Sequence, residues 1–232
     1  MTAIKICGIQ RAEDAVAAAV AGADFVGLVF VPQRRRRVTE EQAAQIVKAL
    51  KDNSGETAQK TPQMVGLFAD QPIGEVNRRI ISCHLEQVQL CGSESLDYCR
   101  RVRAPVIKMI HVPEGGAQDD DLDRLAERIQ KNRDAGNLVT LDRQVGGLQG
   151  GTGKSFDWSI AKRLAQAGHE FLLAGGLTPE NVAEAVRSVA PWGVDVSSGV
   201  ETGGVKDVTK IRAFIQQVRR QDQQVESRHA KS

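Results

Sequence analysis

The stretch that decides the fold is IKICGIQRAEDAVAAAVAGADFVGLVF, residues 4–30. It opens with a short apolar run at 4–7, continues with an alanine-rich segment at 11–23, and closes with a second apolar run at 25–30. Alanine has the highest helix propensity, and short apolar runs bounded by polar residues and glycine are typical of buried strands. The stretch therefore predicts a strand, a helix and a second strand in succession.

The same pattern recurs along the rest of the chain. Further apolar runs lie at 64–69, 86–90, 106–110, 137–142, 170–174 and 193–198, and helical patterns lie at 39–50, 119–130, 178–189 and 208–220. Eight predicted strands alternating with helices favour a single (β/α)8 TIM barrel over a doubly wound open sheet, which usually has fewer strands. We expect the barrel to occupy residues 1–220 and residues 221–232 to form a disordered tail.

The composition narrows the class of protein. The net charge of +2 gives no reason to expect a nucleic-acid or membrane partner. No apolar segment near residue 1 is long enough to be a signal peptide or a membrane span, so the predicted compartment is the cytoplasm. The four cysteines, at 7, 83, 91 and 99, lack the spacing of a metal site or a disulfide framework, so we predict no bound metal.

In a barrel of this kind, the active site lies at the carboxyl ends of the strands. Cys7 ends the first predicted strand and Asp142 the sixth, while the arginine run 34–37 follows the second. Taken singly, each feature also has a simpler interpretation: a small buried residue, a loop cap, and a solvated basic loop. A guanidinium, however, binds a carboxylate with two hydrogen bonds, so one of the arginines could hold an anionic substrate.

Two glycine-containing segments follow the last two predicted strands. They are AGGLTPENV at 174–182 and VSSGVETGG at 196–204. Loops in these positions often bind phosphate in barrels, because glycine lets backbone N–H groups approach an oxyanion. Tight turns alone are the alternative. A third segment, GGLQGGTGKSFDW at 146–158, resembles a nucleotide P-loop only at its end, because Leu148 stands where that motif needs glycine. We interpret it as a loop over the active site.

Four blocks of the sequence together resemble one known family. KICGIQRAEDAVAAAVAGADFVGLVF, LDRQVGGLQGGTGKSFDW, LLAGGLTPENV and VDVSSGVE are similar to phosphoribosylanthranilate isomerases, in the same order and over residues 4 to about 216. The resemblance implies a TIM barrel that needs no cofactor. It also implies an Amadori rearrangement in tryptophan biosynthesis, which converts N-(5-phosphoribosyl)anthranilate to 1-(2-carboxyphenylamino)-1-deoxyribulose 5-phosphate.

The resemblance also implies roles for individual residues. Cys7 corresponds to the general base that removes the proton from C2′ of the ribose, and Asp142 to the general acid that protonates the ring oxygen. Arg36 corresponds to the residue that holds the anthranilate carboxylate, and Asp195 is expected to border the sugar. The loops that bind the substrate phosphate match at Gly153, Gly176, Ser198 and Gly199. We expect a monomer or a homodimer.

Two departures from the family pattern concern the predicted site. The usual QLHG is QLCG here, with Cys91 in the place of the histidine, and Arg34 and Arg35 add positive charge beside Arg36. Neither removes the proposed acid or base. An indoleglycerol-phosphate synthase, a sugar-phosphate epimerase, a non-catalytic phosphometabolite-binding barrel and a nucleic-acid-binding protein remain as weaker alternatives. The synthase would need lysines at strand ends, and the epimerase a fuller set of metal ligands.

Overall fold

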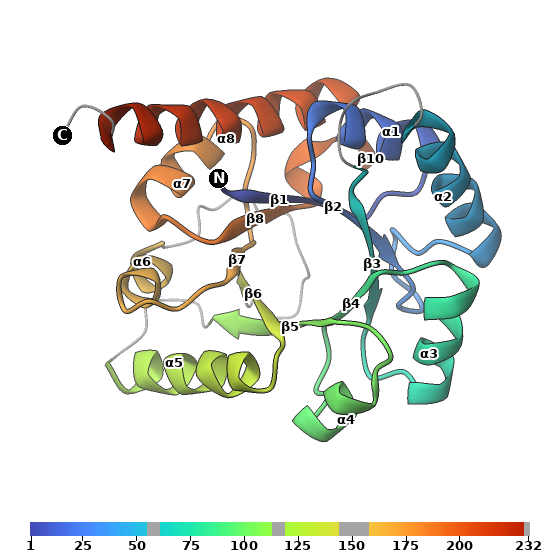
Figure 1. Ribbon diagram of the computed structural model, residues 1–232, viewed down its shortest axis with the longest axis horizontal. Helices are drawn as coiled ribbons and strands as arrows, with labels where there is room; N and C mark the ends of the chain where they lie inside the picture. The colour runs from blue at the N-terminus through green and yellow to red at the C-terminus, as the bar shows by residue number, and fades with distance from the viewer. Residues whose placement is uncertain (55–60, 113–118, 144–157, 230–232) are drawn as a thin grey trace.

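The structure is a computed structural model that describes residues 1–54, 61–112, 119–143 and 158–229. Eight parallel strands close into a barrel in chain order, with β8 pairing back onto β1, and helices surround them (Figure 1). The strands are β1 (Ala3–Cys7), β2 (Phe25–Val29), β3 (Gln63–Phe68), β4 (Gln87–Leu90), β5 (Val106–Val112), β6 (Leu138–Arg143), β7 (Leu172–Leu173) and β8 (Gly193–Val196). The predicted TIM barrel is confirmed.

The helices follow the strands in alternation. They are α1 (Ala12–Ala21), α2 (Glu40–Ser54), α3 (Ile73–Ser82), α4 (Leu96–Arg101), α5 (Asp119–Asp134), α6 (Ser159–Gln166), α7 (Val182–Val189) and α8 (Val208–His229). After β8 the chain forms a 3-10 turn, η1 (Ser198–Val200), and a small antiparallel pair, β9 (Glu201–Thr202) and β10 (Val205–Lys206). The sequence prediction omitted α3, α4 and α6, which have ten residues or fewer.

Side chains of β1 alternate between two buried regions. Ile4 and Ile6 belong to the apolar layer between strands and helices, whereas Cys7 belongs to a smaller cluster inside the barrel. Lys5 also lies on this inner side, because successive side chains of a strand point to opposite faces. The interior cluster further contains Phe25, Val29, Val65, Leu67, Ile107 and Leu172. Cys7 is therefore the last interior residue of its strand.

The start of α2 agrees with the helix predicted from the sequence, whereas the start of α7 differs. The backbone N–H of Thr39 donates to the Gln42 side chain (2.8 Å) and that of Gln42 to the Thr39 hydroxyl (3.2 Å), which is a capping box. By contrast, α7 begins at Val182, not beside Thr178 as the sequence predicted. The Asn181 side chain accepts from the Thr178 N–H (2.8 Å), so residues 178–181 form a turn before the helix.

The predicted disordered tail from residue 221 is wrong for residues 221–229, because α8 continues to His229. Asp222 is buried and accepts hydrogen bonds from the backbone N–H of Thr2 (3.0 Å) and from its hydroxyl (2.6 Å). Arg219 donates to the carbonyl oxygens of Thr2 and Gly22. The helix lies on the outside of the barrel beside α1 and α7, and its last turns reach Thr2, where β1 begins (Figure 1).

Candidate active site

The Cys7 thiol lies at the carboxyl end of β1 in a closely packed setting. Cys7 pairs with Gly27 of β2, and a Cβ at Gly27 would come within 3.0 Å of the Cys7 sulfur. A larger residue at position 27 would therefore require the Cys7 thiol or its neighbours to shift by a few tenths of an ångström. The thiol is buried among the interior residues of the barrel. It faces the end of the barrel where active sites of this fold lie.

Burial raises the pKa of the Cys7 thiol above its usual value, although the Lys5 ammonium works in the opposite direction. A thiol acts as a base only as the thiolate. In the ligand-free barrel, desolvation outweighs the nearby positive charge, so the neutral thiol is favoured. A base at this position therefore needs help from the substrate or from the surrounding charges to lose its proton.

Asp195, which the sequence placed beside a sugar, forms a buried ion pair with Lys5. The Lys5 Nζ lies 3.1 and 3.0 Å from the two carboxylate oxygens, and the side chains are 0% and 6% exposed. Burial works to lower the pKa of Lys5, but the Asp195 carboxylate and Cys7 outweigh it, and the pKa is raised. Lys5 is therefore a permanent cation on the inner side of β1, two residues before Cys7.

Arg36 folds back over Gly8, the residue after Cys7. Gly8 has φ of +76°, and a Cβ there would come within 2.4 Å of Arg36 Cδ and 3.0 Å of Ser197 Oγ. The missing side chain therefore admits the arginine. Arg36 donates from Nε to Glu201 Oε1 (2.6 Å) and from Nη2 to Glu201 Oε2 (3.0 Å). The arginine predicted from the sequence thus lies beside the strand that carries Cys7.

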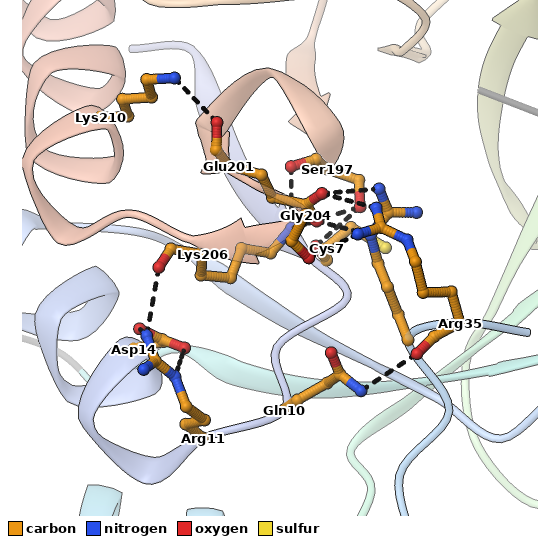
Figure 2. A network of polar contacts seen from close by, with 11 residues as sticks. Cys7, Gln10, Arg11, Asp14, Arg35, Ser197, Glu201, Gly204, Lys206 and Lys210 are labelled. Atoms are coloured by element: carbon orange, nitrogen blue, oxygen red, sulfur yellow. Dashed lines mark hydrogen bonds and ion pairs between the residues drawn. The ribbon is translucent and has the colours of Figure 1, made fainter. Parts of the chain in front are cut away.

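Lys206 links the loop after β8 to Glu201 and, through Ser197, to β1. Its Nζ donates to Ser197 O (2.8 Å) and to Glu201 Oε1 (2.9 Å). The Ser197 hydroxyl in turn donates to the carbonyl oxygen of Cys7 (3.0 Å). Figure 2 shows these side chains gathered into one polar network. The backbone around Cys7 and the loop at 197–201 are therefore held together.

The two glycine-containing loops after β7 and β8 touch each other. A Cβ at Gly199 would lie 1.8 Å from the carbonyl oxygen of Leu177, so the loops could not approach this closely with any other residue there. Gly176 is exposed with φ of +69°, and Ser198 opens the turn η1. Gly176, Ser198 and Gly199 therefore share one region of the barrel mouth.

Asp142 belongs to the last residues of β6, which β7 and β8 separate from β1 in the barrel order. It is half-buried, and it lies opposite His111 of β5 in the strand register. Asp142 and Cys7 therefore stand at the same end of the barrel on different strands. Gly153, the remaining predicted phosphate-loop residue, lies outside the described residues.

Cys91, in the place of the family's histidine, is a half-buried thiol beyond β4. It packs against the interior cluster that contains Cys7, and the Gln89 amide donates to its sulfur at 3.6 Å. Burial, with a smaller contribution from Cys7, raises the pKa of Cys91 to about 12. At neutral pH this thiol is uncharged and cannot act as a second base.

The sequence interpretation missed three charged residues near the site: Glu201 and Lys206 of the network, and Lys5, the partner of Asp195. Glu201 lies inside the segment that was interpreted through its glycines and serines, and Lys206 lies beyond it. Lys5 was interpreted only as a strand residue. A charged residue inside an otherwise apolar strand was the one available signal, because such groups are rarely buried without a partner. Glu201 lies 165 positions from Arg36 and Lys5 lies 190 positions from Asp195, whereas Lys206 is only five positions from Glu201.

Comparison with known proteins matches this barrel to one family. The model of the family N-(5′-phosphoribosyl)anthranilate (PRA) isomerase matches residues 4–217. The chain belongs to the PRA isomerase family. A PRA isomerase of Dehalococcoides mccartyi is 41% identical over 222 residues, covering 96% of this chain and 98% of the relative. The family and the function predicted from the sequence, isomerisation of phosphoribosylanthranilate in tryptophan biosynthesis, are confirmed.

Solved PRA isomerases have the same fold. The crystal structure of the Thermotoga maritima enzyme superposes with a TM-score of 0.77 at 34% identity, covering 94% of this chain and 99% of that one. Another PRA isomerase structure, with a TM-score of 0.74, 32% identity and the same two coverages, holds reduced 1-(o-carboxyphenylamino)-1-deoxyribulose 5-phosphate. Among the described residues of the present chain, no helix is long and apolar enough to cross a membrane.

Proposed function

We propose that this member of the PRA isomerase family catalyses its rearrangement with Cys7 as general base and Asp142 as general acid. Asp142 donates a proton to the ring oxygen of the ribose, the bond from C1′ to that oxygen breaks, and a Schiff base forms. The Cys7 thiolate then removes the proton from C2′, and the resulting enolamine tautomerises to the ketone. A base and an acid on different strands can reach opposite sides of one sugar.

The single observation that supports this assignment most is the shared position of the two groups. Cys7 is the last residue of β1 and Asp142 the next to last of β6, with β7 and β8 between these strands, and the loops after β7 and β8 carry Gly176 and Ser198. A phosphate held by those loops would therefore lie between acid and base. The binding energy of a remote phosphate can orient the reacting sugar.

The proposal extends to the other end of the substrate. We assign the anthranilate carboxylate to Arg36, and the phosphate to Gly153, Gly176, Ser198 and Gly199. For Asp195 we propose a role beside the sugar that it exercises through Lys5, since its carboxylate is engaged by that ammonium. The reduced product bound in the related structure carries both a carboxylate and a phosphate, which fits a site with an anion-binding group at each end.

Several accompanying properties also belong to the proposal. The reaction runs without a metal or an organic cofactor. The partner is a small phosphosugar-anthranilate, not a nucleic acid or a membrane, and the enzyme acts as a monomer or homodimer. The compartment is the cytoplasm, where free thiols such as Cys7, Cys83, Cys91 and Cys99 persist in the reduced state.

The decisive experiment is a turnover assay with purified protein in the presence of a metal chelator. The loss of anthranilate-type fluorescence reports conversion of phosphoribosylanthranilate. We expect turnover by the wild type, and losses of about a hundredfold or more in kcat for Cys7→Ser and Asp142→Asn, the range for removal of a general acid or base. Circular dichroism and melting curves check that both variants fold. A folded variant with near wild-type kcat would overturn the role given to that residue.

A further inference from the structure

Glu201 receives hydrogen bonds from three cationic side chains that come from two separate parts of the chain. Arg35 Nη2 lies 2.7 Å from Oε2, Arg36 uses Nε and Nη2, and Lys206 Nζ lies 2.9 Å from Oε1. The Glu201 side chain is only 5% exposed. Figure 2 shows Glu201 in contact with Arg35 and Lys206. Each carboxylate oxygen accepts at least two hydrogen bonds.

The charges in this network determine the state of Glu201. Burial alone would raise the pKa of Glu201, but hydrogen bonds from Arg36 and Lys206 lower it to about 2. The carboxylate is therefore ionised throughout the neutral range. One negative charge then faces three positive ones, so the network keeps a surplus of positive charge at the mouth of the barrel. A group of this kind attracts a further anion.

The geometry of Arg36 shows what Glu201 contributes. Its Nε and Nη2 form one edge of the planar guanidinium, and that edge is bound to the two oxygens of Glu201. A pair of parallel hydrogen bonds fixes both the position and the plane of an arginine. The stem of Arg36 is confined as well, because it passes over Gly8. An arginine without these two restraints would adopt many rotamers.

We propose that Glu201 is a positioning residue for recognition of the substrate carboxylate. It holds the Arg36 guanidinium in a single orientation and thereby sets the affinity for the carboxylate-bearing end of the substrate. It does not take part in proton transfer. This inference rests on the role proposed above for Arg36, and it adds that Arg36 binds well only when Glu201 restrains it. Lys206 acts as the second restraint on the Glu201 carboxylate.

The test compares two ligands that differ in one group. One is reduced 1-(o-carboxyphenylamino)-1-deoxyribulose 5-phosphate, and the other is the same compound made from aniline, which lacks the carboxylate. For Glu201→Gln we expect the Kd of the first to rise at least about tenfold, the ratio that loss of one charge-assisted hydrogen bond produces. The Kd of the second should change by less than about threefold. In turnover, KM rises and kcat stays within about threefold.

Two further variants distinguish the loss of Arg36 positioning from a general structural effect of the substitution. Glu201→Asp keeps the charge but is one methylene shorter, so its affinity for the carboxylate-bearing ligand should lie between those of the wild type and Glu201→Gln. If Glu201→Gln does not fold, Glu201→Asp takes its place in the test. Glu184→Gln is the matched control, because Glu184 also pairs with an arginine, Arg187, but on an exposed helix surface. We expect this control to leave both Kd values unchanged.

The outcomes distinguish the role of Glu201 from the proposed role of Arg36, on which it rests. In an Arg36→Met background, Glu201→Gln should no longer affect either Kd. If Arg36→Met itself weakens both ligands equally, the carboxylate role of Arg36 is wrong, and the role of Glu201 fails with it. If Arg36→Met weakens only the carboxylate ligand but Glu201→Gln weakens neither or both equally, only the Glu201 inference fails. Tighter binding by Glu201→Gln would mean that Glu201 competes with the ligand, which also overturns it.

Discussion

Lys5 and Asp195 form an ion pair inside the barrel, with the ammonium 3.0–3.1 Å from both carboxylate oxygens. Lys5 precedes Cys7, the last residue of β1, by two positions. Both residues lie in neighbouring strands at the same register level. A buried pair of this kind adds little net stability, because desolvation of two charges offsets their attraction. Its position therefore suggests an electrostatic role toward Cys7, and this role can be measured.

The first prediction concerns pH. A base must be deprotonated, and burial raises the pKa of Cys7, so we expect kcat/KM to rise as pH increases from neutral into the alkaline range. Lys5 works to lower that pKa. Lys5→Met should therefore move the profile to higher pH and reduce kcat/KM at neutral pH, because a smaller fraction of the thiol is ionised without the nearby cation.

The rate of alkylation of Cys7 by iodoacetamide, followed by peptide mass spectrometry, provides a readout that does not depend on the substrate. This alkylation rate should rise with pH over the same range as kcat/KM. Lys5→Arg, which keeps the charge, is the matched control for Lys5→Met. If Lys5→Met destabilises the barrel by leaving Asp195 unpaired, the double variant with Asp195→Asn removes that charge. An unchanged profile in folded Lys5→Met would contradict the electrostatic role.

The second prediction concerns Gly8. Gly8→Ala forces a non-glycine residue into φ of +76° and puts a methyl group against Arg36. We expect a loss of about 1 kcal/mol in stability from the backbone conformation, and a higher KM because Arg36 must move. Gly22→Ala is the matched control, because its φ is +96° but no atom lies within 4 Å of its Cβ. It should show a similar stability loss with an unchanged KM.

The third prediction concerns Cys91. Its pKa of about 12 makes it an uncharged thiol at neutral pH, so its removal takes no charge from the site. Cys91→Ala should keep kcat/KM within about threefold of the wild type, or roughly 0.6 kcal/mol in the activation barrier. Steady-state kinetics at neutral pH is the measurement. A tenfold loss would show that the thiol contacts the substrate, and Cys91→His would then test whether the family's residue restores the rate.

The fourth prediction concerns the end of α8. Asp222→Ala leaves the backbone N–H of Thr2 without its acceptor in a buried position, which should lower the free energy of unfolding by about 1–3 kcal/mol. Urea denaturation measures the change. Asp52→Ala is the matched control: it removes an exposed partner of Lys48, and because solvent screens this pair the effect on stability should be much smaller than that of Asp222→Ala. The KM of Asp222→Ala should not change, because Thr2 precedes β1 at the end of the barrel opposite Cys7.

Most of the fold could be predicted from the sequence because it depends on local patterns. The eight apolar runs differ from the eight strands by only a few residues at their ends, and the parallel barrel follows from their alternation with helices. The helices that escaped prediction are short, so their periodicity is weak. The end of α8 was mistaken for a tail since its polar sequence is stabilised by Thr2, more than 200 residues away.

For the site, the sequence by itself placed Cys7 and Asp142 at or next to the ends of their strands, and the glycines just after the last two strands. The four arginines of the run 34–37 look alike in the sequence, and only the tertiary structure decided that Arg36 lies over Gly8 and against Glu201. It likewise decided that Lys5 has its partner in Asp195. Strand ends follow from local periodicity, whereas ion pairs between distant segments arise only when the barrel closes and removes their charges from water.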